Sequence, residues 1–98
     1  MDARTFWQVQ QIMSLAMQLN PTETRQETTG SRPTVSVQLS GHTCGLYVEV
    51  FAEGWKADVP STYRAALYLE DDPHDALGAV IDLLEKLCVQ WKDKEVAS

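Results

Sequence analysis

Residues 35–51, VSVQLSGHTCGLYVEVF, decide the fold because they contain two alternating segments joined by a short turn. Apolar residues occupy every second position over 35–40, and they do so again over 46–51. A period of two is what a strand with one buried face requires, and 41–43 is short enough to be a turn. The stretch therefore predicts a β-hairpin with one apolar face against a core.

A third alternating segment, 64–69, predicts a third strand. The intervening segment 52–63 is predicted to be a loop or an edge strand, because Gly54 and Pro60 would interrupt a ladder, and it leaves the position of Trp55 open. Three consecutive strands with short connections most simply form an antiparallel meander.

Residues 3–19 are predicted to form a helix, because apolar residues recur there at spacings of three and four. The residues of this apolar stripe are Phe6, Val9, Ile12, Met13, Leu15, Ala16 and Leu19. Asp2 is the predicted N-cap, and a capping box of Thr5 and Gln8 one turn later is the alternative. Pro21 ends the helix, because the residue before a proline disfavours helical geometry.

A second helix is predicted over 73–92, with Asp72 and Pro73 as a strong start signal. Its apolar stripe consists of Leu77, Val80, Leu84, Leu87 and Trp91. Two amphipathic helices can cover only one face of a sheet. The predicted fold is therefore α+β, in the order helix-strand-strand-strand-helix: a three-stranded antiparallel meander with two helices packed on one face. Residues 1–98 are predicted to form a single domain, and the polar segment 20–33 an exposed, mobile loop.

Length and composition indicate one globular core. The chain has 98 residues, of which 44% are hydrophobic. It shows no signal-peptide pattern and no apolar run of about 20 residues that could cross a bilayer, so a cytoplasmic protein is expected. Cys44 and Cys88 are expected to stay reduced in that compartment, and a disulfide between them is disfavoured.

The charge of the chain is concentrated toward its C-terminus. The formal net charge is −6, yet residues 1–33 balance to zero, whereas residues 70–98 carry eight acidic residues against three lysines. Binding to nucleic-acid phosphates needs Lys and Arg, so no direct nucleic-acid binding is expected.

Six acidic residues between 70 and 85 have no Lys or Arg among them. They are Glu70, Asp71, Asp72, Asp75, Asp82 and Glu85, and we call them the acidic ridge. At 100° per residue, Asp75, Asp82 and Glu85 lie opposite the apolar stripe of their helix and face solvent. Such a ridge would attract the basic surface of a nucleic-acid-binding protein. Two alternatives remain: carboxylates favoured at a helix start followed by a solvated helix face, and a divalent cation, for which no calcium-loop spacing is present.

The uncovered face of the predicted sheet is aromatic for a surface exposed to water. The residues predicted to contact a partner there are Tyr47, Glu49, Phe51, Arg64 and Tyr68. Tyr and Phe among small polar groups are typical interface anchors. The alternative is that cross-strand aromatic pairs only stabilise the sheet.

The chain contains no motif for catalysis. It lacks a Gly-rich phosphate loop, a Ser-centred elbow and a metalloprotease motif. The spacings of His42, Cys44, His74 and Cys88 do not form the compact pairs of a zinc site, and Cys88 is expected in the core. No catalytic residue, metal ligand or cofactor is predicted. A cleft between the helices and segment 20–33 would be needed for an enzymatic role.

The order of the elements is similar to that of double-stranded RNA-binding domains. Those domains place lysines at the start of their last helix, where this chain has DDPHD at 71–75, so the resemblance does not extend to RNA binding. In size, acidity and lack of motifs the chain also resembles the small inhibitors encoded by phages and mobile elements, including anti-CRISPR proteins. That resemblance implies an inhibitor that acts in the cytoplasm of a host cell.

These observations predict a non-enzymatic, small acidic protein-binding module. In its specific form, the acidic ridge engages a basic, nucleic-acid-binding protein and inhibits it, as the resemblance to anti-CRISPR proteins implies. The alternative is a homodimeric structural or scaffolding domain whose open aromatic sheet faces pack together. No membrane contact is expected.

Overall fold

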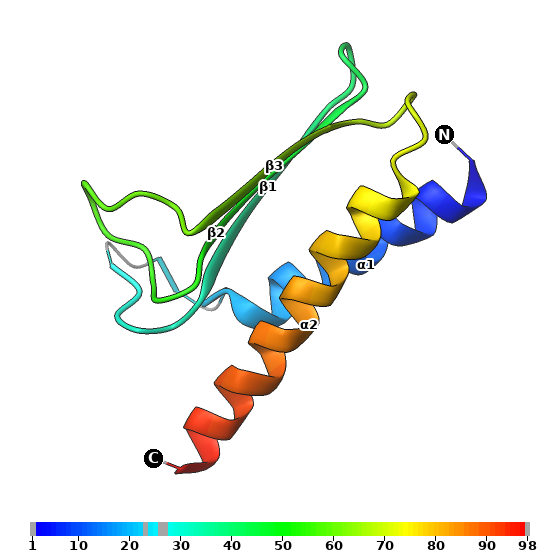
Figure 1. The fold of residues 1–98 in the computed structure, drawn as a ribbon. Helices are drawn as coiled ribbons and strands as arrows, with labels where there is room; N and C mark the ends of the chain where they lie inside the picture. The colour runs from blue at the N-terminus through cyan, green and yellow to red at the C-terminus, as the bar shows by residue number, and fades with distance from the viewer. Residues whose placement is uncertain (1, 23, 26–27, 98) are drawn as a thin grey trace.

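The computed structural model describes residues 2–22, 24–25 and 28–97, and it has the predicted α+β architecture (Figure 1). Its elements are α1 (Ala3–Leu19), β1 (Thr34–Ser40), β2 (Gly45–Phe51), β3 (Tyr63–Tyr68) and α2 (His74–Ala97). The strands form one antiparallel sheet in the order β1-β2-β3, and both helices cover the same face of it (Figure 1). The helices lie side by side and run in the same direction, so their N-terminal ends meet.

The alternating residues of the hairpin face the helices as their period requires. Val48 of the central strand pairs with Val37 on one side and with Ala65 on the other. The three apolar residues of β2 on this face, Leu46, Val48 and Val50, are buried. They bury apolar surface against both helices, and that burial is the main force that holds the two layers together.

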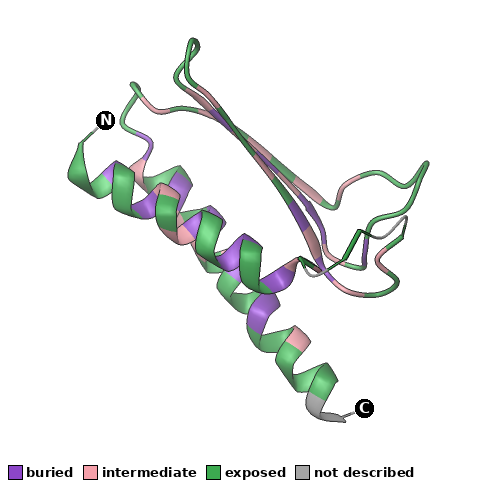
Figure 2. Cartoon of the chain, turned by 180° about the vertical axis from the view of Figure 1, so that it is seen from behind, coloured by how far each residue is buried: buried purple, intermediate pink, exposed green. Residues whose placement is uncertain are grey.

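Each helix contributes one side to the same core. The large apolar side chains of the helices that are fully buried are Ile12, Leu19, Leu77, Val80 and Leu84. Buried positions follow the inner side of each helix, whereas the outer sides are exposed (Figure 2). Neither helix, over the residues that the structure describes, has the length and apolar character that a membrane crossing requires.

The apolar stripe of the first helix is narrower in the structure than in the sequence prediction. Ile12, Leu15 and Ala16 are buried, but Phe6 and Met13 point outward and are 55% and 43% exposed. The helix is apolar around more than half of its circumference, and the sheet and α2 together cover only part of it. The bounds of α1 agree with the prediction, including Asp2 as the N-cap, whose carboxylate accepts the Thr5 N–H at 2.7 Å.

The second helix differs from its prediction at both ends. It continues to Ala97, five residues beyond the predicted end. It begins at His74, one residue later than predicted. Asp72 has a left-handed backbone with φ of 41°, and its carboxylate lies 3.0 Å from His74 Nδ1. The carbonyl of Pro73 accepts the Leu77 N–H and begins the helical hydrogen bonds.

The segment predicted as an exposed loop, 20–33, is tied to the fold at both of its ends. Arg32 Nε donates to the carbonyl of Leu19 at 2.7 Å, and Asn20 pairs through its side-chain amide with the backbone of Val35 at 2.6 and 2.8 Å. Gly54 adopts φ of 100°, and a Cβ there would overlap the carbonyl of Gly30. Segments 28–33 and 52–55 therefore pack closely, and Gly54 is required where they meet.

Candidate functional site

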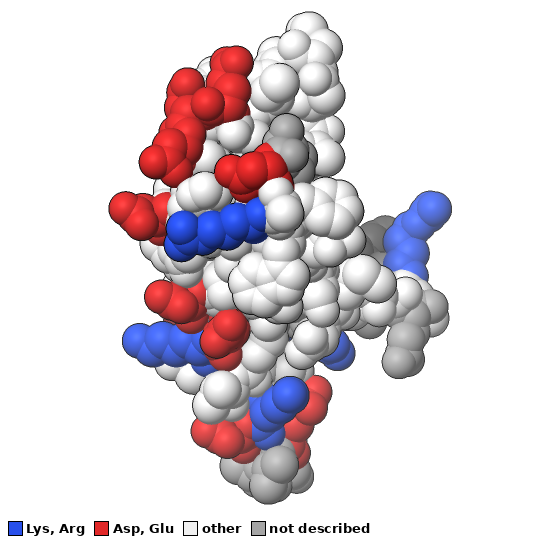
Figure 3. Space-filling model, turned by 90° about the vertical axis from the view of Figure 1, so that its right-hand side faces the viewer, with Lys and Arg blue, Asp and Glu red and all other residues white. Residues whose placement is uncertain are grey.

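The acidic ridge is a surface of exposed carboxylates. All six of its residues are exposed. Among the described residues its only ion pair is that of Asp72 with His74, so no Lys or Arg forms a direct ion pair with a ridge carboxylate. In Figure 3 a group of acidic side chains lies at the upper left beside an uncharged area, and further acidic side chains alternate with Lys and Arg lower on the same side.

The first three ridge residues lie in a turn that backbone hydrogen bonds connect to the hairpin and to the end of β3. The Leu69 N–H donates to the carbonyl of Cys44 at 2.8 Å, and the Asp71 N–H donates to the carbonyl of Tyr68 at 3.1 Å. These bonds hold the turn against the hairpin and β3. Residues 70–72 are thereby presented next to the start of α2, and the ridge continues along the outer side of that helix.

The ridge ends where basic residues enter the outer side of α2. Lys86 follows the last ridge residue directly, and Lys92 and Lys94 lie further along the same helix. The C-terminal half of α2 therefore has mixed charge. The field of the ridge is strongest over the N-terminal half of the helix and the preceding turn.

The open sheet face offers less aromatic surface than the sequence predicted. Phe51 is only 8% exposed, so little of its side chain is available to a partner. Tyr47 and Glu49 are half-buried, and the Tyr47 hydroxyl donates to Glu49 Oε1 at 3.1 Å. Arg64 and Tyr68 are exposed. Tyr68 borders a shallow depression of about 270 Å³ that also includes Tyr47.

A polar cluster joins the N-terminal ends of the two helices. Thr5 Oγ1 lies 3.0 Å from His74 Nε2, and Gln8 Nε2 donates to the carbonyl of His74 at 3.1 Å. Asp2 Oδ1 approaches the same imidazole nitrogen at 3.4 Å. We call Asp2, Thr5, Gln8 and His74 the helix clamp. Sequence analysis missed it, because its partners are about 70 positions apart and no local pattern connects them.

Two residues of the helix clamp, together with Asp72, have the distances of a catalytic relay but lack the access that catalysis needs. Asp72, His74 and Thr5 form a carboxylate-imidazole-hydroxyl series with both contacts at 3.0 Å. A nucleophile must reach its substrate, however, and Thr5 is only 2% exposed. The cluster therefore binds the two helices to each other and leaves no room for a reacting group.

The Asp2 carboxylate has a low pKa because it accepts hydrogen bonds in its charged form. The hydrogen bond from the Thr5 N–H makes the largest contribution, and the nearby His74 adds to it. Together they lower the pKa of Asp2 from 3.8 to about 2. Asp2 therefore stays charged at the positive end of α1 over the physiological range.

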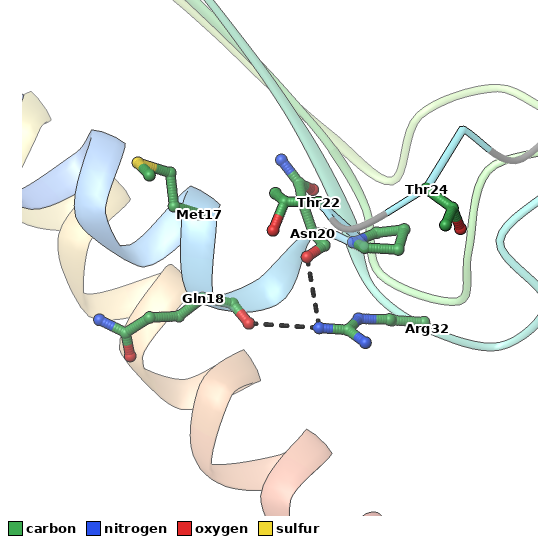
Figure 4. A pocket seen from close by; sticks show the side chains of 7 residues that line it. Met17, Gln18, Asn20, Thr22, Thr24 and Arg32 are labelled. Carbon is green, nitrogen blue, oxygen red and sulfur yellow. Dashed lines mark hydrogen bonds between the residues drawn. The ribbon is translucent and has the colours of Figure 1, made fainter.

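A polar pocket of about 330 Å³ lies at the C-terminal end of α1 (Figure 4). Its lining residues are Met17, Gln18, Asn20, Pro21, Thr22, Thr24 and Arg32. Among the lining residues that the structure describes, none carries a carboxylate, an imidazole or a thiol. The Arg32 guanidinium donates to the carbonyls of Gln18, Leu19 and Asn20, so its charge stabilises the helix end.

The cysteines are apart and free. Cys44 is exposed in the hairpin turn, whereas Cys88 is buried in the core as predicted, and burial raises the pKa of its thiol. Within the part of the chain that the structure describes, no three His, Cys, Asp or Glu side chains are arranged to hold a metal ion.

No family model, curated protein or solved structure matches this chain.

Proposed function

We propose that this chain is a non-enzymatic protein-binding module that engages the basic surface of a nucleic-acid-binding protein through its acidic ridge. The observation that carries the proposal is the exposure of all six ridge carboxylates without a Lys or Arg partner in the described chain. Carboxylates in this state attract a cationic surface and speed its approach.

The spacing of the ridge makes its carboxylates act together. Asp75 and Asp82 are about 10 Å apart along the helix axis, since each residue adds about 1.5 Å. That distance is close to the Debye length at physiological salt, so a partner senses the combined field of the ridge. A row of exposed negative charges attracts a basic channel as a phosphate backbone does, although its charge density is lower. Occupation of that channel would exclude nucleic acid, which is how the chain would inhibit its partner.

A binding role suits the rest of the surface better than an enzymatic role. The Thr5 hydroxyl of the triad-like contacts is buried, and the described residues that line the pocket at the end of α1 include no carboxylate or imidazole that could act as an acid or a base. Dimerisation through the open sheet face has less support, because Phe51 is buried and Tyr47 is half-buried. Tyr68 alone among the sheet aromatics predicted to bind a partner is exposed.

The test compares two double variants with equal charge. Asp82→Lys with Glu85→Lys reverses part of the ridge, and Glu53→Lys with Asp93→Lys is the control at exposed acidic residues outside it. Each replacement adds two positive charges, so both variants carry −2 in place of −6. Proteins captured from a host lysate at low and high salt are identified by mass spectrometry, and each is tested for displacement of a bound oligonucleotide.

The proposal expects capture of a basic, nucleic-acid-binding protein that is lost at high salt and with the ridge variant. The control variant should retain most of the capture. Equal losses in the two variants would show that net charge alone matters. Capture that is independent of salt and of both variants would contradict the proposal.

A further inference from the structure

The outer side of α1 is an exposed apolar surface without charge. Phe6, Met13 and Met17 are 55%, 43% and 62% exposed, and Trp7 beside them is 57% exposed. Residues 5–22 contain no Asp, Glu, Lys or Arg, although the net charge of the chain is −6. This helix therefore presents large apolar side chains to solvent where a helix of a small acidic protein normally presents charges.

The exposed residues follow the spacing of a coiled-coil seam. Phe6, Gln10, Met13 and Met17 are separated by four, three and four residues, which is the alternation of d and a positions in a heptad. We call these four residues the α1 seam. A shallow groove of about 490 Å³ runs along Gln10, Met13 and Met17. The seam lies about 130° around the helix from the buried side, so neither the sheet nor α2 covers it.

The α1 seam is complementary to itself. Its spacings are the same when they are counted from either end, so two antiparallel copies place Phe6 opposite Met17 of the partner subunit and Gln10 opposite Met13 of the partner subunit. Such reciprocity is what a two-fold symmetric interface requires.

Charge also favours a second copy on this surface. Two copies repel each other through their net charge of −6, and residues 5–22 are the longest part of the sequence without a charge. Antiparallel contact along α1 therefore brings the fewest like charges together. A basic partner would gain nothing on this surface, because it has no carboxylate to meet it.

We propose that two copies of this chain associate through their α1 seams as an antiparallel, two-fold symmetric dimer. The exposed parts of Phe6, Trp7, Met13 and Met17 amount to about 400 Å² in each copy, if a large side chain exposes roughly 200 Å². The total is below the usual size of a stable interface. The dimer is therefore weak and reversible, and it forms independently of the acidic ridge.

The first experiment measures association of the full chain by sedimentation equilibrium from about 1 µM to 1 mM, the range for weak complexes. Met13→Glu places two carboxylates near the two-fold axis and is expected to weaken association at least tenfold. Val89→Glu is the control, because Val89 is 60% exposed on α2 and the charge change is the same. It should change association less than about twofold, the scale expected for a remote charge.

A charge-exchange experiment tests the antiparallel register. Phe6→Lys alone and Met17→Glu alone should each abolish the dimer. The two changes in one chain should restore it, because each new ammonium then faces a new carboxylate of the other copy. Circular dichroism and chemical denaturation verify that each variant remains folded, as expected for exposed positions.

A monomer at all concentrations up to about 1 mM would overturn the proposal. Association that Met13→Glu and Val89→Glu weaken equally would also overturn it, because the seam would then have no special role. Failure of the double variant to restore association would exclude the antiparallel register.

Discussion

The two helices have the same role on their inner sides and opposite characters on their outer sides. Both fill the core with aliphatic side chains such as Ile12 and Leu84, which are fully buried. Outside, α1 exposes Phe6, Met13 and Met17 without any charge, whereas α2 exposes ridge carboxylates. The fold needs only the inner sides, so the outer sides are free to serve different contacts.

Leu77→Ala should disrupt the packing on the inner side of α2 and should lower the free energy of unfolding more than any other substitution named below. Leu77 is fully buried between the layers, so its truncation leaves a cavity and lowers the free energy of unfolding by about 3 kcal/mol. Val89→Ala, on the exposed outer side of α2, should change it by less than about 0.5 kcal/mol. Urea denaturation monitored by tryptophan fluorescence gives both values. Similar losses in the two variants would contradict the assignment of inner and outer sides.

Thr5→Val tests how much the polar contact between the two helices contributes to stability. Valine keeps the shape of the side chain but removes the hydroxyl that contacts His74, so the free energy of unfolding should fall by about 1 kcal/mol. Thr22→Val, at an exposed position, is the matched control. Equal stability of Thr5→Val and the wild type would mean that the contact of the Thr5 hydroxyl with His74 adds nothing to the free energy of unfolding.

Much of this arrangement could be predicted from the sequence, because its signals are local. The alternation within 35–51 predicted the hairpin, and Asp2 and Pro21 predicted the two ends of α1. The outward direction of Asp75 and Asp82 followed from the position of the leucines on the same helix, since a stripe on one side leaves the opposite side to solvent.

The rest depended on tertiary contacts. The first helix has apolar residues around most of its circumference, so periodicity could not show that Ile12 would be buried and Phe6 exposed. The burial of Phe51 was not indicated by the alternation of its strand, and the close packing of Gly54 on Gly30 joins parts of the chain that no local pattern connects. The contact of Thr5 with His74 bridges 69 positions and becomes visible only when both helices are in place.

Asp2→Asn should have the smallest effect on the free energy of unfolding. It tests the contribution of the charge at the start of α1. Asparagine can still cap the helix, so the change mainly removes the charge. The pKa of Asp2 is about 2 in the fold and 3.8 ordinarily, so its contribution to stability is complete above about pH 4 and is lost as pH falls toward 2. The stability advantage of the wild type over Asp2→Asn should shrink over that interval. Denaturation at pH 2, 4 and 7 measures it, and an advantage that grows on acidification would contradict the assignment.

The central claim is that α1 and α2 present two independent contact surfaces. The salt dependence of the two associations tests this claim most directly. Sedimentation equilibrium and partner capture are measured in parallel at low and high sodium chloride for the wild type, Met13→Glu, and Asp82→Lys with Glu85→Lys. The account predicts that salt strengthens the dimer, because it screens the repulsion between two chains of charge −6, and weakens capture by the ridge. Met13→Glu should abolish only the dimer, and the ridge variant should abolish only the capture. If salt moves both associations in the same direction, or if either variant abolishes both, the two surfaces are not independent and the account is wrong.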